Sequence, residues 1–348
     1  MKINHPQNLA SENFAVLKAP LYAGPARCIG VQTKDGFEYQ QPKLSAALSA
    51  QRTTPTSMGV ICSLFNNKII NYRPLGGGEN FVYLINDNWV FRIPKEDNAK
   101  SANRREQILL KELSKYVKST QIPAYNFWDY EAGVGGYEEI KGIALSYKFY
   151  NNLMMREKSL LAHDLALAIS EIHSLPIKNT PFLKISTPEA REYIKVAGSL
   201  LGPQGIFSQK HAKKIQQAIK VTQGLMSKPD SALVVVHSDL HCDNIIVNPK
   251  AKKLSGLIDF SDARIGFAAI DFANLYRVSP QLAEEAAGIY ANTKNIDAHD
   301  FIAECRAWST VWQAACISRN YYAKTLREQK RVIRAGRAIN YLLELKQI

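Results

Sequence analysis

Two stretches decide how this chain is read: Val236–Val247, VHSDLHCDNIIV, and Gly256–Asp262, GLIDFSD. The apolar, β-branched run Leu233–Val236 ends at His237 and predicts a buried strand. The polar residues that follow, Asp239 among them, are therefore expected on a turn that leaves a buried element.

A β-hairpin is expected directly after this turn. Two further apolar runs, Ile245–Val247 and Leu254–Ile258, are separated by Pro249–Lys253, whose composition is typical of a hairpin turn. The hairpin would bring Asn244, at the start of one strand, next to Asp259, at the end of the other.

The side chains gathered in this way suit phosphoryl transfer. Asn244 and Asp259 offer hard oxygen ligands, which suit Mg²⁺ bound together with the phosphates of a nucleotide. Asp239, which lies outside that pair, could accept the proton of a substrate hydroxyl as it attacks the terminal phosphate. Alternatively, His237 and Asp239 cap a turn while Asn244 and Asp259 satisfy strand ends, but that interpretation does not account for the ordered set.

The motif His-x-Asp-Leu-His-x-x-Asn, with a following strand that ends Ile-Asp-Phe, resembles the catalytic core of the aminoglycoside phosphotransferase and choline kinase-like superfamily. The resemblance implies a bilobal, protein-kinase-like fold and a kinase that uses ATP and Mg²⁺. It implies that Asp239 is the catalytic base and that His237 braces its loop. It also implies that Asn244 and Asp259 bind Mg²⁺, and that Asp271 supports the catalytic loop.

An antiparallel sheet with a glycine-rich turn is expected before the motif. The apolar pattern predicts three strands, at Ile69–Tyr72, Phe81–Ile85 and Trp89–Ile93. Between the first two, the backbone N–H groups of Gly76, Gly77 and Gly78 could lie over nucleotide phosphates, although three glycines also make an ordinary tight turn. Neither P-loop nor Rossmann spacing occurs, which disfavours a Walker-type NTPase.

The resemblance assigns a second phosphate contact to the third strand. Trp89–Pro94, WVFRIP, resembles the strand that carries a phosphate-gripping lysine in many relatives, and Arg92 stands at that position. Arginine keeps the charge and offers a planar fork, but its larger head group alters the geometry. Glu106, on a helix expected at Ala99–Val117, resembles the glutamate that pairs with this cation. Otherwise, Arg92 is a surface strand residue and Glu106 is a solvated charge.

Two more strands, Tyr125–Tyr130 and Gly142–Phe149, would complete a five-stranded small lobe. Ser146–Tyr150 resembles the connection between the lobes, where relatives hold adenine through backbone hydrogen bonds. We expect His173 to be a satisfied helix-end residue. Helical periodicity predicts four helices in the larger part of the chain, at Leu160–His173, Ser279–Tyr290, Asp300–Tyr322 and Leu326–Leu345.

Composition leaves several partners open. The 348 residues carry a formal charge of +13, but the basic residues are distributed, which favours a solvated surface over specific nucleic-acid binding. The acids of Glu284–Glu304 could attract a polyamine-like substrate or form ordinary helix surface, and Trp308 and Trp312 are expected in the core or on a cleft wall. The five cysteines show no metal-ligand spacing. Without a signal peptide or an apolar run of about 18 residues, we expect a cytoplasmic protein, with export as an effector left open.

The sequence therefore predicts an α+β fold of the bilobal, protein-kinase-like kind. We expect a flexible arm at 1–62, a nucleotide-binding N-lobe with a small antiparallel sheet at 63–150, and a mainly helical catalytic and substrate-binding C-lobe at 151–348. The expected function is ATP- and Mg²⁺-dependent transfer of the γ-phosphate to a hydroxyl of a small molecule, of the antibiotic, sugar or amino-alcohol class. One alternative is a secreted effector kinase that acts on a protein. The other is a nucleotide-binding pseudokinase, against which the complete motif argues.

Overall fold

The computed structural model describes residues 31–33, 36–38, 55–65, 69–199, 201, 207–319, 335–336 and 338–345. The chain divides into two compact units, Met1–Thr56 and Ser57–Ile348. The first unit contains an antiparallel pair of short strands, β1 (Val31–Thr33) and β2 (Gly36–Glu38). Most of the expected arm lies outside the described residues.

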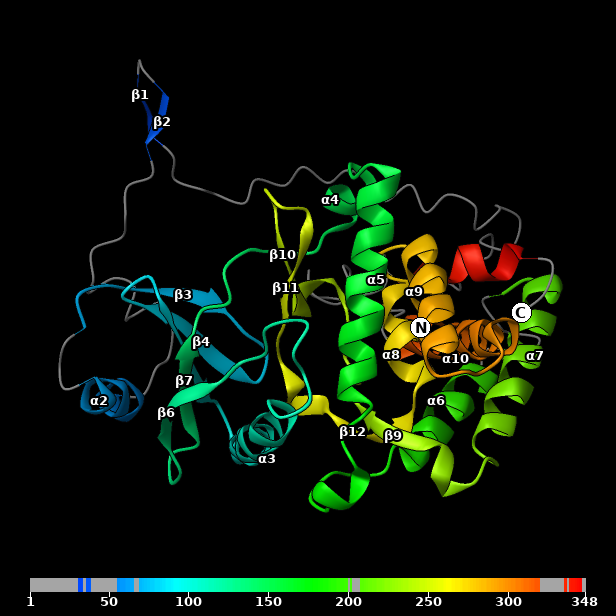
Figure 1. Cartoon of the computed structure of the whole chain (residues 1–348), viewed down its shortest axis with the longest axis horizontal. Helices are drawn as coiled ribbons and strands as arrows, with labels where there is room; N and C mark the ends of the chain where they lie inside the picture. The colour runs from blue at the N-terminus through cyan, green and yellow to red at the C-terminus, as the bar shows by residue number, and fades with distance from the viewer. Residues whose placement is uncertain are drawn as a thin grey trace, which may run out of the picture. The chain divides into compact units, whose positions relative to one another are not determined.

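A five-stranded antiparallel sheet forms the smaller lobe of the second unit (Figure 1). A helix that was not predicted, α2 (Pro55–Leu64), crosses the expected end of the arm, and its Ile61 is fully buried in the same apolar cluster as Phe91 of the sheet. In spatial order the strands are β3 (Tyr72–Gly76), β4 (Asn80–Ile85), β5 (Trp89–Pro94), β7 (Val134–Glu138) and β6 (Tyr125–Asp129).

The strand count agrees with the sequence prediction, but one strand is a different segment. The fifth strand is β7 and not Gly142–Phe149. Two consecutive glycines disfavour a strand by propensity, yet β7 requires them. A Cβ at Gly136 would lie 2.3 Å from the ring of Phe91, and one at Gly135 would lie 2.3 Å from the ring of Tyr125.

The first strand also differs from its prediction, because it begins where Ile69–Tyr72 was expected to end. β3 contains Pro74, which usually argues against a strand. β3 lies at the edge of the sheet and is irregular between Pro74 and Gly76, so the missing N–H of the proline is tolerated there.

The larger lobe is mainly helical, and the predictions for α5, α9 and α10 are confirmed with shifted ends. α6 and α7 were not predicted, and most of the helix expected at Leu326–Leu345 lies outside the described residues, although residues 335–336 and 338–344 are helical. The labelled helices are α4 (Tyr147–Asn151), α5 (Met155–Ile172), α6 (Thr187–Ser199), α7 (Gln209–Leu225), α8 (Ala269–Leu275), α9 (Pro280–Thr293) and α10 (Ala298–Arg319).

Two small antiparallel sheets carry the loops of the two motif stretches, Val236–Val247 and Gly256–Asp262. β9 pairs with β12, and β10 lies between β8 and β11, which confirms the predicted hairpin. The strands are β8 (Ile143–Ala144), β9 (Leu233–Val236), β10 (Ile245–Asn248), β11 (Lys253–Leu257) and β12 (Arg264–Phe267). Four single 3-10 turns complete the lobe: η1 (Ile177–Asn179), η2 (Asp230–Ala232), η3 (Cys242–Asn244) and η4 (Phe260–Asp262).

The connection between the lobes is Glu139–Gly142, and not Ser146–Tyr150 as expected. β7 belongs to the five-stranded sheet, whereas β8, which follows the connection, pairs with β10 of the larger lobe. Beyond β8 the chain turns into α4, because the Oγ of Ser146 accepts a hydrogen bond from the backbone N–H of Phe149 and caps the helix.

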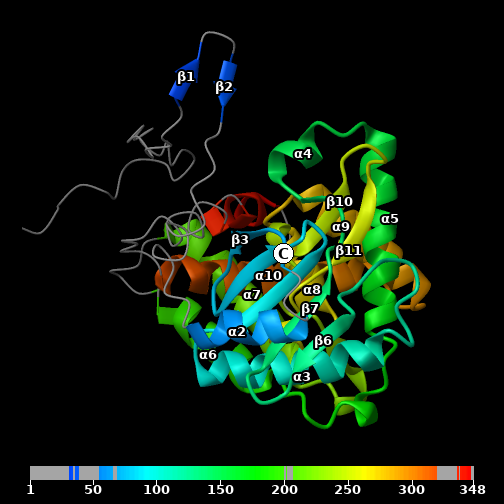
Figure 2. The same cartoon turned by 90° about the vertical axis from the view of Figure 1, so that its left-hand side faces the viewer.

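Helix α3 (Asp97–Leu113) joins the two lobes. It contacts β5 and β7 of the sheet and η4 of the larger lobe, and Figure 2 shows it running past the lower end of the sheet. Leu109 and Leu113 are fully buried in the main apolar core, together with Leu165 of α5. The burial of these apolar side chains therefore fixes α3 against the larger lobe. The same helix also contacts β5 and β7 of the sheet.

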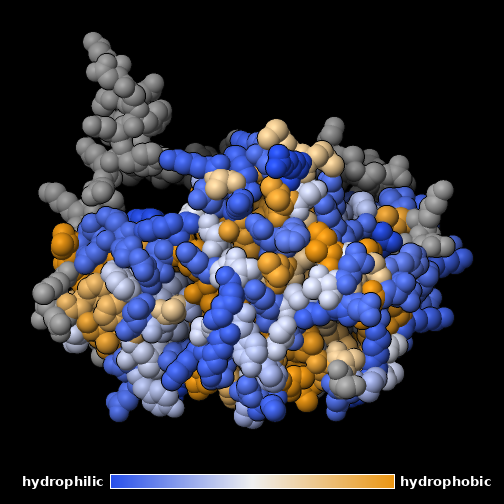
Figure 3. Space-filling model, in the orientation of Figure 1, coloured by the Kyte–Doolittle hydropathy of each residue, from blue (hydrophilic) through white to orange (hydrophobic). Residues whose placement is uncertain are grey.

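The face of the molecule drawn in Figure 3 mixes polar and apolar side chains. Figure 3 shows hydrophilic side chains over most of the visible face, with small apolar areas between them, as expected for distributed charge. None of the helices in the described part of the chain combines the length and the apolar character needed to cross a membrane.

The close packing of β7 against Phe91 predicts a stability defect for Gly136→Ala. The added methyl group would meet a fully buried ring, which we expect to lower the free energy of unfolding by about 1–3 kcal/mol. Gly224→Ala is the matched control, because a Cβ there meets no atom within 4 Å and α7 should gain up to about 1 kcal/mol. Urea unfolding followed by circular dichroism measures both. Equal midpoints for the two variants would contradict this packing.

Candidate active site

Arg92, on β5, is the centre of a buried ion network. Its Nη1 pairs with the Oε2 of Glu106 on α3, and its Nη2 lies 2.9 Å from the Oδ1 of Asp259, just after β11. Glu106 also accepts hydrogen bonds from the backbone N–H of Phe260, at 2.9 Å, and from the hydroxyl of Tyr125, at 3.3 Å. The pair expected between Arg92 and Glu106 is therefore present, and Asp259 completes it.

The ion pairs of this network shift the pKa values of Arg92 and Asp259 in the directions that favour their charged forms. Burial lowers the pKa of Arg92, but the carboxylates of Glu106 and Asp259 outweigh it and raise that pKa well above its ordinary value. Burial raises the pKa of Glu106, and Arg92 opposes this effect. For Asp259 burial also acts to raise the pKa, but Arg92 and the hydroxyl of Ser261 bring it below its ordinary value. Arg92 and Asp259 are therefore both ionised at neutral pH.

Asp239 lies on the turn after β9, as predicted, and Asn244 and His237 hold it there. The Nδ2 of Asn244 donates to the backbone oxygen of Asp239 at 2.9 Å and to its Oδ2 at 3.3 Å. The Nδ1 of His237 accepts from the N–H of Asp239, and its Nε2 lies 3.0 Å from the oxygen of Ile258. Through these two contacts His237 ties the turn to the hairpin.

The fully buried carboxylate of Asp271, on α8, anchors the same turn. It accepts from the backbone N–H groups of His237, at 2.9 Å, and Ser238, at 2.7 Å. Its Oδ2 also lies 3.0 Å from the Nε2 of His173, whose Nδ1 lies 2.9 Å from the hydroxyl of Tyr290. His173 is thus a satisfied helix-end residue, as expected.

Two residues of the site have a left-handed backbone conformation, which residues other than glycine seldom adopt. Ser238 has φ 73° and Asp259 has φ 66°. Such conformations cost about 1–3 kcal/mol each and persist where the surroundings impose them. Asn274 donates to the oxygen of Ser238 at 2.9 Å, and the backbone N–H of Ile258 donates to the oxygen of Asn244 at 3.0 Å.

His241 is part of the site, although the sequence analysis gave it no role. Its Nε2 lies 3.3 Å from the Oδ2 of Asp239, and its Nδ1 accepts from the N–H of Asp243 at 3.1 Å. Burial acts to lower the pKa of His241, but the contact with Asp239 outweighs it and raises that pKa to about 9. The Nε2 of His241 is therefore placed to donate to the Asp239 carboxylate. Its place in the motif, two residues after Asp239, was the available signal.

The glycine turn follows β3 at the open edge of the small lobe. Gly76 and Gly77 have φ of 91° and 135°, and a Cβ at Gly77 would lie 2.3 Å from the oxygen of Asn80. Lys95, at the end of β5, donates to the oxygen of Gly78 at 2.8 Å. The turn thus requires glycine, and a lysine that the sequence analysis did not single out holds it.

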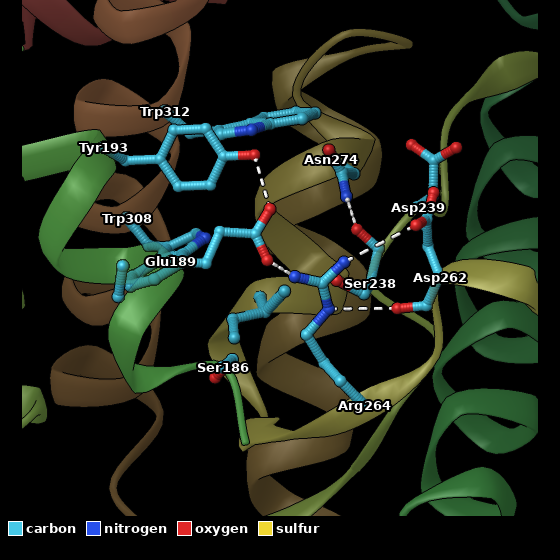
Figure 4. Close-up of a pocket in the computed structure, with 12 residues that line it drawn as sticks. Ser186, Glu189, Tyr193, Ser238, Asp239, Asp262, Arg264, Asn274, Trp308 and Trp312 are labelled. Carbon is cyan, nitrogen blue, oxygen red and sulfur yellow. Dashed lines mark hydrogen bonds and ion pairs between the residues drawn. The ribbon is translucent and has the colours of Figure 1, made fainter. Parts of the chain in front are cut away.

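A pocket of about 110 Å³ opens beside Asp239 (Figure 4). Trp308 and Trp312 of α10 lie on its wall, which confirms one of the two placements expected for them. The acids of Glu284–Glu304 are not among its lining residues. Glu284 pairs with Arg306 instead, and Glu304 pairs with Lys228. The lining residues are Ser186, Glu189, Ala190, Tyr193, Ser238, Asp239, Asp262, Arg264, Ile270, Asn274, Trp308 and Trp312.

Carboxylates accumulate between the glycine turn and this pocket. Burial, followed by the charges of Asp239 and Asp259, raises the pKa of Asp262 to about 6. Both side-chain hydrogen bonds of Asn244 use its Nδ2, which leaves its Oδ1 to accept. An excess of negative charge beside an amide oxygen and a carboxylate fits a hard divalent cation such as Mg²⁺.

The fold and this clustering define a kinase-like transferase, and comparison with known proteins specifies the family. A model of the phosphotransferase enzyme family matches residues 71–305. The match covers more than half of the chain, and the chain belongs to this family. It is therefore a phosphotransferase, and the expected family and fold are confirmed.

Solved structures of other proteins share this fold. The chain resembles the GDP and kanamycin complex of an aminoglycoside phosphotransferase of the APH(2″) type, with 20% identity, a TM-score of 0.66 and coverage of 83% of this chain and 98% of that chain. For ADP-bound APH(2″)-Ib the identity is 22% and the TM-score is 0.60, with coverage of 84% of this chain and 97% of that chain. For the apoenzyme of a macrolide 2′-phosphotransferase from Brachybacterium faecium the identity is 14% and the TM-score is 0.57, with coverage of 81% of this chain and 98% of that chain.

The role of Asp271 as an anchor predicts a large effect for a nearly isosteric change. In Asp271→Asn, the amide nitrogen would face the backbone N–H of His237 or Ser238, and that hydrogen bond would be lost. Each lost hydrogen bond to a charged group costs about 1.5–3 kcal/mol of stability. We therefore expect a lower melting temperature and lower activity. Asp230→Asn, at an exposed carboxylate, should change neither. Calorimetric melting of both variants provides the test, and indistinguishable melting temperatures would show that Asp271 is not an anchor.

Proposed function

We propose that this enzyme transfers the γ-phosphate of ATP to a hydroxyl group of a small molecule, with Mg²⁺ bound at the nucleotide. The contact between Arg92 and Asp259, which are 167 positions apart in the sequence, is the observation that carries the proposal. It joins the third strand of the sheet to the end of the β10–β11 hairpin. Residues expected to contact phosphate and metal thus border one space.

On the nucleotide side, Arg92 and the turn at Gly76–Gly78 would contact the phosphates, and Glu106 would hold Arg92 in place. The substitution of arginine for lysine leaves this pair intact, because Arg92 reaches Glu106 and Asp259 together. It therefore gives no support to the pseudokinase alternative. Asn244 and Asp259 would hold Mg²⁺, which neutralises charge on the phosphates when it is bound.

On the acceptor side, Asp239 would take the proton of the attacking hydroxyl. It lines the pocket that would receive the acceptor, and Asn244, His237 and His241 fix its position. A carboxylate held in one orientation can accept a proton without first being ordered, and this positioning supplies much of the rate in phosphoryl transfer.

Asp239→Asn tests this assignment of roles. The amide cannot accept the proton, so ADP release in the presence of a hydroxylated acceptor should fall about 10²–10⁴-fold. Binding should persist, because Arg92, Asn244 and Asp259 are retained. With Mg²⁺ and ATP at 100 times the dissociation constant, the free energy of unfolding should still rise by about 2.7 kcal/mol.

The measurements are coupled ADP assays and thermal melts, with GTP in place of ATP as a parallel series. Asp230→Asn, at an exposed carboxylate outside this loop, is the control and should keep its turnover. Undiminished turnover in Asp239→Asn would remove Asp239 from the role of base. The absence of any nucleotide-dependent rise in melting temperature, with ATP or GTP at millimolar concentration, would overturn the proposed function as a whole.

A further inference from the structure

An ion pair lies across the pocket beside Asp239. Figure 4 shows the guanidinium of Arg264, from the start of β12, between Glu189 of α6 and Asp262 of η4. Its Nη1 pairs with the Oε2 of Glu189, and its Nε donates to the backbone oxygen of Asp262 at 3.0 Å. The hydroxyl of Tyr193 donates to the other oxygen of Glu189 at 2.9 Å.

The members of this bridge satisfy one another. The side chain of Arg264 is only 18% exposed, so removing its partner would leave a poorly hydrated charge. Tyr193 and the backbone of Asp262 hold the two ends in place without any ligand. An acceptor therefore gains little by separating Glu189 from Arg264, and it has to fit in the space that the bridge leaves.

That space is small, at about 110 Å³. Pockets that enclose drug-sized ligands occupy roughly 300–1,000 Å³. Trp308 and Trp312 supply aromatic surface on the side of α10. Ser186 and Asn274 are polar residues of the lining, so the pocket wall is not purely apolar.

We infer that the Glu189–Arg264 bridge sets the size limit of the acceptor site and restricts the enzyme to small alcohols of one ring or less. The non-reacting part of such an acceptor lies against Trp308 and Trp312, and its hydroxyl faces Asp239. Multi-ring acceptors, such as the kanamycin bound by one structural relative, are excluded. The inference rests on the proposed function and names the acceptor class of the same site.

An acceptor panel in the ADP-release assay tests the inference. The small acceptors are ethanolamine, homoserine and ribose, and the large ones are kanamycin and erythromycin. In the wild-type protein, kcat/KM for the best small acceptor should exceed that for either large one at least tenfold. The double variant Glu189→Ala, Arg264→Ala opens the pocket and removes both charges of the bridge together, and it should reduce this ratio at least tenfold.

The control removes an ion pair of similar composition that lies outside the pocket, in Lys228→Ala, Glu304→Ala. It should keep the wild-type ratio. Equal use of kanamycin and the small acceptors by the wild-type protein would overturn the inference. An unchanged ratio in the pocket variant would also overturn it.

Fluorescence quenching gives a readout that does not depend on any acceptor. With Trp89→Phe and Trp128→Phe in the background, Trp308 and Trp312 are the remaining indoles. Acrylamide should quench them before and after the bridge is removed, whereas a bulky polymer-linked quencher should reach them only afterwards, with at least a threefold increase in quenching. The same quenching with and without the bridge would overturn the inference. Loss of nucleotide binding in the melts, by contrast, would overturn only the proposed function.

Discussion

The burial of a guanidinium between two carboxylates constrains the rest of this structure. Arg92 is 6% exposed, and a charge so placed is tolerated only when its partners are in position. Its partners come from α3 and from the end of the catalytic hairpin. The sheet, the helix and the hairpin must therefore assemble together for any of them to be electrostatically satisfied.

In the larger lobe, the buried carboxylate of Asp271 imposes a similar constraint on the groups around it. Asp271 fixes the backbone of His237 and Ser238, and His173 fixes Asp271. The left-handed conformations of Ser238 and Asp259 store strain at the two ends of the site, and these hydrogen bonds stabilise that arrangement. The groups proposed to react are thus held by hydrogen bonds within the protein, an arrangement that suits preorganised catalysis.

Sequence reasoning was most successful where function restricts local order. The stretch around Asp239, the hairpin and the pairing of Arg92 with Glu106 could all be read from residue types and spacing, because their chemistry needs those residues in that sequence. β7 could not, since its glycines are explained only by the rings of Phe91 and Tyr125 that cross them. The Glu189–Arg264 bridge was equally hidden, because it depends on how α6, which was not predicted, packs beside β12.

The same distinction separates the two sides of the proposed site. The residues proposed for the nucleotide side stand in the sequence motifs, whereas the wall of the pocket beside Asp239 includes residues of α6 and α10 and charges that pair with each other. Relatives with this fold are named for aminoglycoside and macrolide acceptors, so the fold alone does not choose the acceptor. We propose that the pocket wall makes this choice.

The central claim is that Arg92 and Asp259 act on one nucleotide, and a double-mutant cycle tests it most directly. The quantity to measure is the dissociation constant of Mg²⁺–ATP by titration calorimetry, in the wild-type protein, Arg92→Ala, Asp259→Ala and the double variant. The account predicts that each single change weakens binding and that the two effects are non-additive by about 0.5–3 kcal/mol. Additive effects, or binding that neither change weakens, would contradict it.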